Sequence, residues 1–229
     1  MPDMSPTHIV FPLFAGVTQL DFTGPLQFLS RLPGAQIHIA AADMAPVATD
    51  SALSLLPTTG FADCAQADIL CVPGGHGVTA ALHDPAMLGF IARQAASARW
   101  VTAVCTGTFL LGGAGLLSGK RATTHWAYRH LLPMVGANPT PGRVVEDGHI
   151  ITAGGVTSGM DFALTLIARE AGEDVARAIQ LALEYDPQPP FTAGHPDSAP
   201  APVLAQLQAR VYDAAAARMA DALATMPKI

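Results

Sequence analysis

Short runs of consecutive apolar residues alternate along the chain with stretches in which apolar residues recur every three or four positions. The short runs predict strands buried on both faces, whereas the periodic stretches predict helices with one apolar side. We expect strands at 9–14, 36–42, 69–72 and 100–104, and extended segments within 47–56 and at 122–124. Helices are expected at 20–32, 85–98, 109–117, 126–134, 159–171, 173–184 and 203–224.

The order of these elements predicts the fold class. Strands that alternate with helices favour a mostly parallel sheet with helices on both faces. Asp147-Gly148, between the alternating segments of 143–152, predicts one hairpin. We find no internal repeat and no dividing linker. We therefore expect one α/β domain over residues 1–229, with a Pro-rich loop and helix, 187–229, as a C-terminal appendage.

Composition narrows the class of protein. Half of the residues are hydrophobic and 13% are charged, as in a compact globular protein. The net charge of −6, without a basic stripe, argues against nucleic acid as a partner. The apolar runs are too short to cross a membrane, and the first residues do not resemble a signal peptide. Three cysteines in unlike contexts indicate a reducing compartment, so we expect a cytoplasmic protein.

Cys105 is the first candidate for chemistry. It leaves the strand at 100–104 and opens the next helix with almost no loop between them. Such a turn projects a side chain outward, as in a nucleophile elbow, and the start of a helix favours the thiolate form. A buried structural cysteine is the alternative, and this position favours the functional interpretation. Cys71, inside the strand at 69–72, is expected to be core.

A glycine-rich turn is expected at the same edge of the sheet. Pro73-Gly-Gly-His-Gly77 follows the strand at 69–72, and glycines let backbone N–H groups approach a ligand closely. Together with the N–H of Thr106, the N–H groups of Gly75 and His76 are candidates for an oxyanion hole. An ordinary strand-to-helix turn is the alternative, since the segment lacks the dinucleotide fingerprint and the P-loop lysine.

Two further residues each allow two interpretations. Asp21, with apolar neighbours, is either a partly buried acid with a raised pKa or the cap of a helix. His125, between Thr124 and Trp126, is either a base or a helix start, and the second is favoured. We predict no metal, because no pair of cysteines or cluster of histidines has ligand spacing.

Several segments together resemble the DJ-1/PfpI superfamily, a flavodoxin-like sandwich with a nucleophile elbow. They spread over most of the chain: 19–25 (QLDFTGP), 69–75 (ILCVPGG), 101–107 (VTAVCTG), 119–128 (GKRATTHWAY) and 183–191 (LEYDPQPPF). Within the superfamily they are most similar to the isocyanide hydratases. The peptidase-like branch often places His after the nucleophile, where this chain has Thr106, and many members place a Glu where Asp21 stands. Related regulators continue into a DNA-binding module, which this chain does not show.

The resemblance implies a cofactor-independent lyase that hydrates a small-molecule isocyanide to an N-substituted formamide. In this interpretation Cys105 attacks the isocyanide carbon to give a thioimidate, and Asp21 acts as general acid and base. Thr106 positions Asp21 or the intermediate. The resemblance also implies a homodimer. Two alternatives stay open: a redox-sensing or ligand-binding module without catalysis, and a glyoxalase-like hydratase with His125 as base.

Overall fold

One mixed sheet forms the centre of the protein. The computed structural model describes residues 6–227, and within them seven strands pair in the order β10-β11-β7-β6-β1-β2-β5. All neighbours are parallel except the hairpin of β10 and β11. The strands are β1 (Thr7–Pro12), β2 (Ala35–Ala41), β5 (Thr59–Gly60), β6 (Ile69–Val72), β7 (Trp100–Val104), β10 (Val144–Asp147) and β11 (Ile150–Ala153). Small pairs outside it join β3 (Val47–Ala48) to β4 (Ser54–Leu55), and β8 (Arg121–Ala122) to β9 (Asn138–Pro139).

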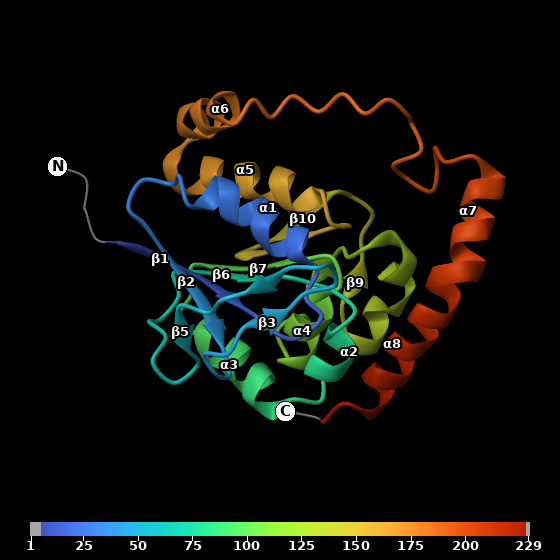
Figure 1. The fold of residues 1–229 in the computed structure, drawn as a ribbon, viewed down its shortest axis with the longest axis horizontal. Coiled ribbons are helices and arrows are strands. Elements are labelled where there is room, and N and C mark those ends of the chain that lie inside the picture. Colours follow the sequence, from blue (N-terminus) through green and yellow to red (C-terminus); the bar gives the residue numbers. More distant parts are fainter. Residues whose placement is uncertain (1–5, 228–229) are drawn as a thin grey trace.

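Helices cover both faces of the sheet (Figure 1). One layer contains α1 (Gln19–Leu29), α5 (Ser158–Ala171) and α6 (Glu173–Ala182). The other contains α2 (Val78–Ala81), α3 (Pro85–Ala95) and α4 (Gly107–Gly113). A third group lies at one edge: the 3-10 helix η1 (Trp126–Val135) and a helical segment made of α7 (Ala201–Leu207), η2 (Gln208–Tyr212) and α8 (Asp213–Thr225). The predicted mostly parallel α/β fold is confirmed.

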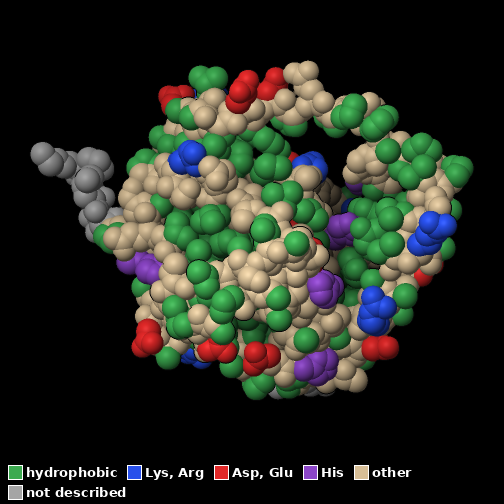
Figure 2. Space-filling view, viewed as in Figure 1, with side chains coloured by type: hydrophobic (Ala, Val, Ile, Leu, Met, Phe, Trp, Pro, Cys, Tyr) green, Lys and Arg blue, Asp and Glu red, His purple; other side chains and the backbone are tan. Residues whose placement is uncertain are grey.

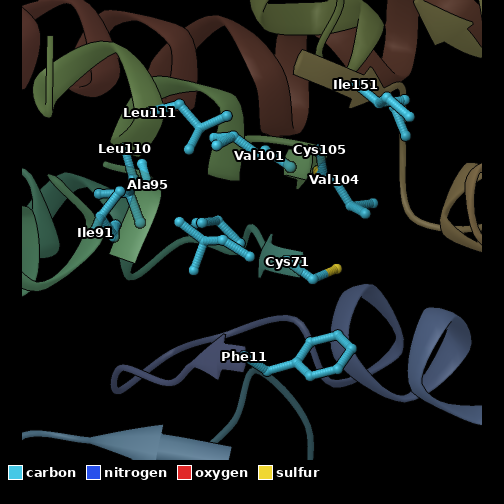
Figure 3. Close-up of a cluster of buried hydrophobic side chains, with 14 of the residues drawn as sticks. Phe11, Cys71, Ile91, Ala95, Val101, Val104, Cys105, Leu110, Leu111 and Ile151 are labelled. Atoms are coloured by element: carbon cyan, nitrogen blue, oxygen red, sulfur yellow. The ribbon is translucent and has the colours of Figure 1, made fainter. Parts of the chain in front are cut away.

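The strands beneath the site are apolar because they are covered on both sides. All residues of β6 are buried, and so are all residues of α4, which follows β7. Phe11 of β1, Cys71 of β6 and Val104 of β7 belong to one continuous buried cluster (Figure 3). Cys71 is thus a core residue, as predicted. A single core spans the sheet and both helix layers, which fixes the carboxyl ends of β6 and β7 relative to each other.

Most predicted elements are present, and the differences have local causes. α4 ends at Gly113, short of the predicted Leu117. Pro25 lies inside α1 instead of near its start, so α1 lacks one N–H for the Asp21 carbonyl. α2 and β5 were not predicted, since each is too short to show a period.

The C-terminal region differs most from its prediction. The helical segment is continuous from α7 to α8, but it widens into a π-helical turn at η2. Residues 183–200 lead to it from α6 in a long arc, and Figure 2 shows an opening between this arc and the body of the protein. Met219, Ala222 and Leu223 are buried, because α8 packs against η1 and α2. Within the predicted appendage, 187–229, these residues of α8 therefore join the core, whereas α7 has no buried residue.

Candidate active site

The Cys105 backbone adopts a conformation that few non-glycine residues tolerate. Its φ is +57°, a left-handed value that costs on the order of 1–2 kcal/mol. Hydrogen bonds on both sides hold it there. Its N–H donates to the carbonyls of Ala153 (3.1 Å) and Gly154 (2.9 Å), and its carbonyl accepts the Thr124 hydroxyl at 2.6 Å. Such strain persists only where neighbours over-determine it, and this is typical of functional sites.

The elbow docks against the glycine-rich turn that follows β6. A Cβ on Gly107 would lie 2.6 Å from the Pro73 carbonyl oxygen, and one on Gly74 would lie 2.6 Å from the Thr106 nitrogen. Only glycine therefore permits this approach at either position. The Thr106 hydroxyl joins the two turns, because it accepts the Gly75 N–H at 2.9 Å and donates to the Gly75 carbonyl at 3.1 Å.

Asp21 lies directly beneath this junction. It is the third residue of α1, is fully buried, and accepts the Gly74 N–H at 3.1 Å through Oδ2. Thr18 occupies the helix cap, so the alternative of a capping Asp21 is wrong. Oδ1 has no hydrogen-bond partner among the described residues. The carboxyl group lies close enough to the Cys105 thiol for each of the two groups to shift the pKa of the other.

Burial changes the acidity of both groups. Desolvation raises the pKa of Asp21 from its ordinary 3.8 to about 7, against the contacts with Cys105 and the Gly74 N–H, which lower it. Desolvation and the charge of Asp21 raise the pKa of Cys105 well above its ordinary value. The N–H groups of Thr106 and Val156 point at the sulfur and act in the opposite direction. The net effect raises the pKa of the thiol, whereas its position at the start of a helix predicts a lower one.

A cavity opens in front of Cys105. It holds about 250 Å³ and is lined by Thr18, Asp50, Gly75, His76, Thr79, Cys105, Thr106, His125, Tyr128, Val156, Tyr212, Ala215, Arg218 and Met219. The predicted site residues Cys105, Thr106, Gly75, His76 and His125 thus lie in one place. Asp21 does not line the cavity and reaches it only past Cys105.

The predicted oxyanion hole is only partly supported. The Gly75 N–H is occupied by the Thr106 hydroxyl, so the prediction that it faces a ligand is wrong for this conformation. The N–H of His76 has no acceptor among the described residues, which leaves it able to serve a ligand beside the N–H of Thr106. Val156 adds a second N–H at the sulfur, beside that of Thr106, and was not predicted. Only the Gly154-Gly155 break before it marked this loop in the sequence.

His125 begins η1, as the favoured interpretation predicts. Its Nδ1 accepts the Ala127 N–H at 3.3 Å, and its Nε2 lies 3.4 Å from the Tyr212 hydroxyl. Burial lowers its pKa from 6.5 to about 4, so the ring is neutral near pH 7. An occupied Nδ1 and a low pKa both disfavour the role of general base. Tyr212 escaped sequence analysis because it lies about a hundred residues from the elbow, on a helix without any motif.

Two negative findings concern the whole described region. Within residues 6–227, no three His, Cys, Asp or Glu side chains are grouped so that they could hold a metal ion. No described helix is long and apolar enough to span a bilayer.

A mostly parallel sheet with helices on both faces, and a cysteine at a strained strand-to-helix turn above a buried carboxyl, define the class of α/β proteins with an elbow cysteine. The chain belongs to the DJ-1/PfpI family, whose pattern matches residues 7–169. It is 53% identical to the isonitrile hydratase of Pseudomonas putida over 89% of each chain. A THiJ/PfpI family protein from Pseudomonas syringae has the same fold, with a TM-score of 0.89, 40% identity, and coverage of 96% of this chain and 95% of its own.

A transcriptional regulator is also similar to this chain, at lower sequence identity. The HTH-type transcriptional regulator GbdR of Pseudomonas aeruginosa is 29% identical over 80% of this chain and 52% of its own length. The likeness to the hydratase is therefore both closer and more complete than the likeness to this regulator.

Proposed function

We propose that this protein is an isocyanide hydratase that converts an isocyanide and water to an N-substituted formamide. The observation that carries the proposal is the fully buried Asp21 carboxyl close to the Cys105 thiol, which lines a small cavity. The 53% identity to an isonitrile hydratase over 89% of the chain supports the same reaction. The natural isocyanide substrate is a small molecule, since the cavity holds about 250 Å³.

In the first step one proton moves from the Cys105 thiol to Asp21 and then to the substrate carbon. Asp21 takes the thiol proton while the Cys105 sulfur bonds to the terminal carbon of R–N≡C. One π pair of the triple bond becomes a lone pair on nitrogen, and the carbon keeps its own pair. Asp21 then returns the proton to that carbon, which gives the thioimidate Cys–S–CH=N–R. The N–H groups of Thr106 and Val156 stabilise the charge that develops on sulfur.

In the second step water releases the product. Asp21 accepts one water proton as the water oxygen bonds to carbon, and the C=N π pair moves to nitrogen, which takes that proton. The C–S bond then breaks as the C=O bond forms, and the remaining hydroxyl proton returns to the Cys105–Asp21 pair. The product is R–NH–CHO. Water has supplied its oxygen and the proton on nitrogen, and the second water proton replaces the thiol proton that was transferred to carbon.

The test is turnover of p-nitrophenyl isocyanide by the purified protein, with the formamide quantified. We expect Cys105→Ala to abolish turnover, with Cys71→Ala as the matched control, because Cys71 lies in the core away from the cavity. An inactive wild-type protein, or a fully active Cys105→Ala variant, would contradict the proposal. Turnover of methylglyoxal in place of isocyanide would revive the glyoxalase-like alternative.

We also infer a homodimer in a reducing, cytoplasmic environment. Apolar side chains at Val203, Leu207 and Val211 follow one side of the α7–η2 segment and are exposed. The three cysteines are free thiols, as expected without an oxidising compartment. Light scattering after size exclusion tests the homodimer, and a mass near 23.7 kDa would contradict it. Fractionation of cells tests the cytoplasmic location, and recovery outside the cytoplasm would contradict it.

A further inference from the structure

Tyr212 reaches the active-site cavity from an unusual point in the chain. It ends the π-helical turn η2, and π-helical turns occur frequently at functional sites. Its ring packs against His125 and Trp126, at centroid distances of 5.0 and 4.9 Å. Tyr212 lines the cavity together with Cys105, and its hydroxyl is close enough for a charge on Cys105 to act on it. Its phenol group therefore faces the position where the substrate would react.

The hydrogen bonds around His125 fix the direction of the Tyr212 hydroxyl. Because Nδ1 accepts the Ala127 N–H, the neutral ring carries its proton on Nε2. The Nε2–H group then donates to the Tyr212 oxygen at 3.4 Å. The Tyr212 hydrogen is left free to donate elsewhere. Two successive hydrogen bonds, from the Ala127 N–H to His125 and from His125 to Tyr212, thus leave the Tyr212 O–H as a donor at the cavity.

Tyr128 offers the contrasting case. It also lines the cavity, but no described residue makes a hydrogen bond to its hydroxyl. Its O–H group is therefore not oriented by the protein in the way that the Tyr212 group is. Preorganised donors contribute most to catalysis, because they need no reorganisation when charge develops.

We propose that Tyr212 is a catalytic hydrogen-bond donor to the substrate nitrogen, with His125 as its positioning residue. This inference rests on the proposed isocyanide hydration. The nitrogen of R–N≡C has no lone pair, and it gains one only when the Cys105 sulfur bonds to carbon. Tyr212 therefore stabilises the transition state and the thioimidate without binding the nitrogen of the free substrate. No net proton transfer from Tyr212 is needed.

The decisive variant is Tyr212→Phe, which keeps the ring packing and removes only the hydroxyl. We expect kcat to fall by about 100-fold, as for the loss of one preorganised donor, with KM unchanged. Tyr185→Phe is the matched control, because Tyr185 bonds to Asp161 outside the cavity. The rate of Cys105 alkylation by iodoacetamide should be the same in all three proteins, since Tyr212 acts on nitrogen and not on sulfur.

A double-mutant cycle tests the role of His125. If His125 acts through Tyr212, then His125→Phe lowers kcat less than Tyr212→Phe does, and the double variant is no slower than Tyr212→Phe alone. A wild-type protein that does not hydrate isocyanides overturns both this inference and the proposed function. An active wild-type protein with an equally active Tyr212→Phe variant overturns this inference alone, as does a rise in KM with kcat unchanged.

Discussion

Cys105 and Asp21 are both buried acids, so desolvation raises the pKa of each, and the charge of Asp21 raises the pKa of Cys105 further. With a pKa of about 7 for Asp21 and a higher one for Cys105, the pair holds two protons in acid and one in neutral solution. Only the one-proton form contains both a nucleophile and a base for its proton. The chemistry of this site therefore depends on shared burial and not on an isolated reactive thiol.

This sharing predicts a pH profile. Below pH 7 Asp21 is protonated and cannot accept the thiol proton, so kcat/KM should rise about tenfold per pH unit up to about 7 and then level off. Initial rates between pH 5 and 9 measure it. In the Asp21→Asn variant we expect most of the activity to be lost, and the remaining kcat/KM should no longer rise between pH 5 and 7. A wild-type rate that does not change between pH 5.5 and 8.5 would contradict the assignment of Asp21.

The same burial predicts that Asp21 destabilises the fold. Its folded pKa of about 7 lies above the ordinary 3.8, so the native state binds an extra proton between these values and stability falls as pH rises through that window. The pKa difference corresponds to roughly 4 kcal/mol at most. Asp21→Asn should therefore exceed wild type in free energy of unfolding at pH 8, and exceed it less at pH 5. Urea unfolding at both pH values measures this, and an equal difference at both would contradict it.

At the scale of elements, the loop between β11 and α5 positions the site as much as the elbow does. The carbonyl of Gly154 accepts the Cys105 N–H, and the N–H of Val156 points at the sulfur. Gly155 lies against His125, where a Cβ would come within 2.7 Å of the ring. A short loop thus contacts both Cys105 and His125.

Replacement of Gly155 by Ala should disturb this arrangement. The added methyl group would push His125 away, with a loss of about 1–3 kcal/mol in unfolding free energy, as for other overpacked sites, and a lower kcat. Gly194→Ala is the matched control, because a Cβ there would meet nothing within 4 Å. Thermal unfolding and turnover measure both variants. If Gly155→Ala had the same unfolding temperature and the same kcat as wild type, the prediction would be contradicted, and the His125 ring would be shown to move without loss of stability or activity.

One wall of the cavity comes from the C-terminal helical segment α7–η2–α8, which a long irregular loop connects to the rest of the protein. Tyr212, Ala215 and Met219 line the cavity, whereas the arc of residues 186–200 has no helix or strand and is mostly exposed. The segment is held by α8, which packs against η1 and α2. The cavity therefore depends on contacts between regions that are far apart in the sequence.

This arrangement predicts the outcome of limited proteolysis. Cleavage should occur first in residues 186–200, because exposed irregular backbone is the preferred protease substrate. The C-terminal fragment should stay bound, since Met219, Ala222 and Leu223 are buried, and activity should persist until denaturant releases it. Size exclusion with mass spectrometry follows the fragment. Full activity after its complete removal would contradict the role of the segment in the cavity.

The amino-acid sequence predicts the sheet, most of its helices and the strand-to-helix turn at Cys105. These features depend on local patterns, such as the apolar run of 69–72 and the glycines around it, which a chain displays wherever it folds. It also singled out Asp21, but left open whether that residue capped a helix. Resemblance to a family, rather than periodicity, pointed to the chemistry.

The spatial arrangement of these residues follows from packing in the folded chain. Packing placed Asp21 beneath Cys105 and raised the pKa of both, which a sequence cannot show, because desolvation depends on residues that are distant along the chain. It also occupied the Gly75 N–H with Thr106 and brought Tyr212 to the cavity. Burial and long-range contact are properties of the folded chain as a whole, and they raise the pKa of a thiol whose position at a helix start predicts a lower one.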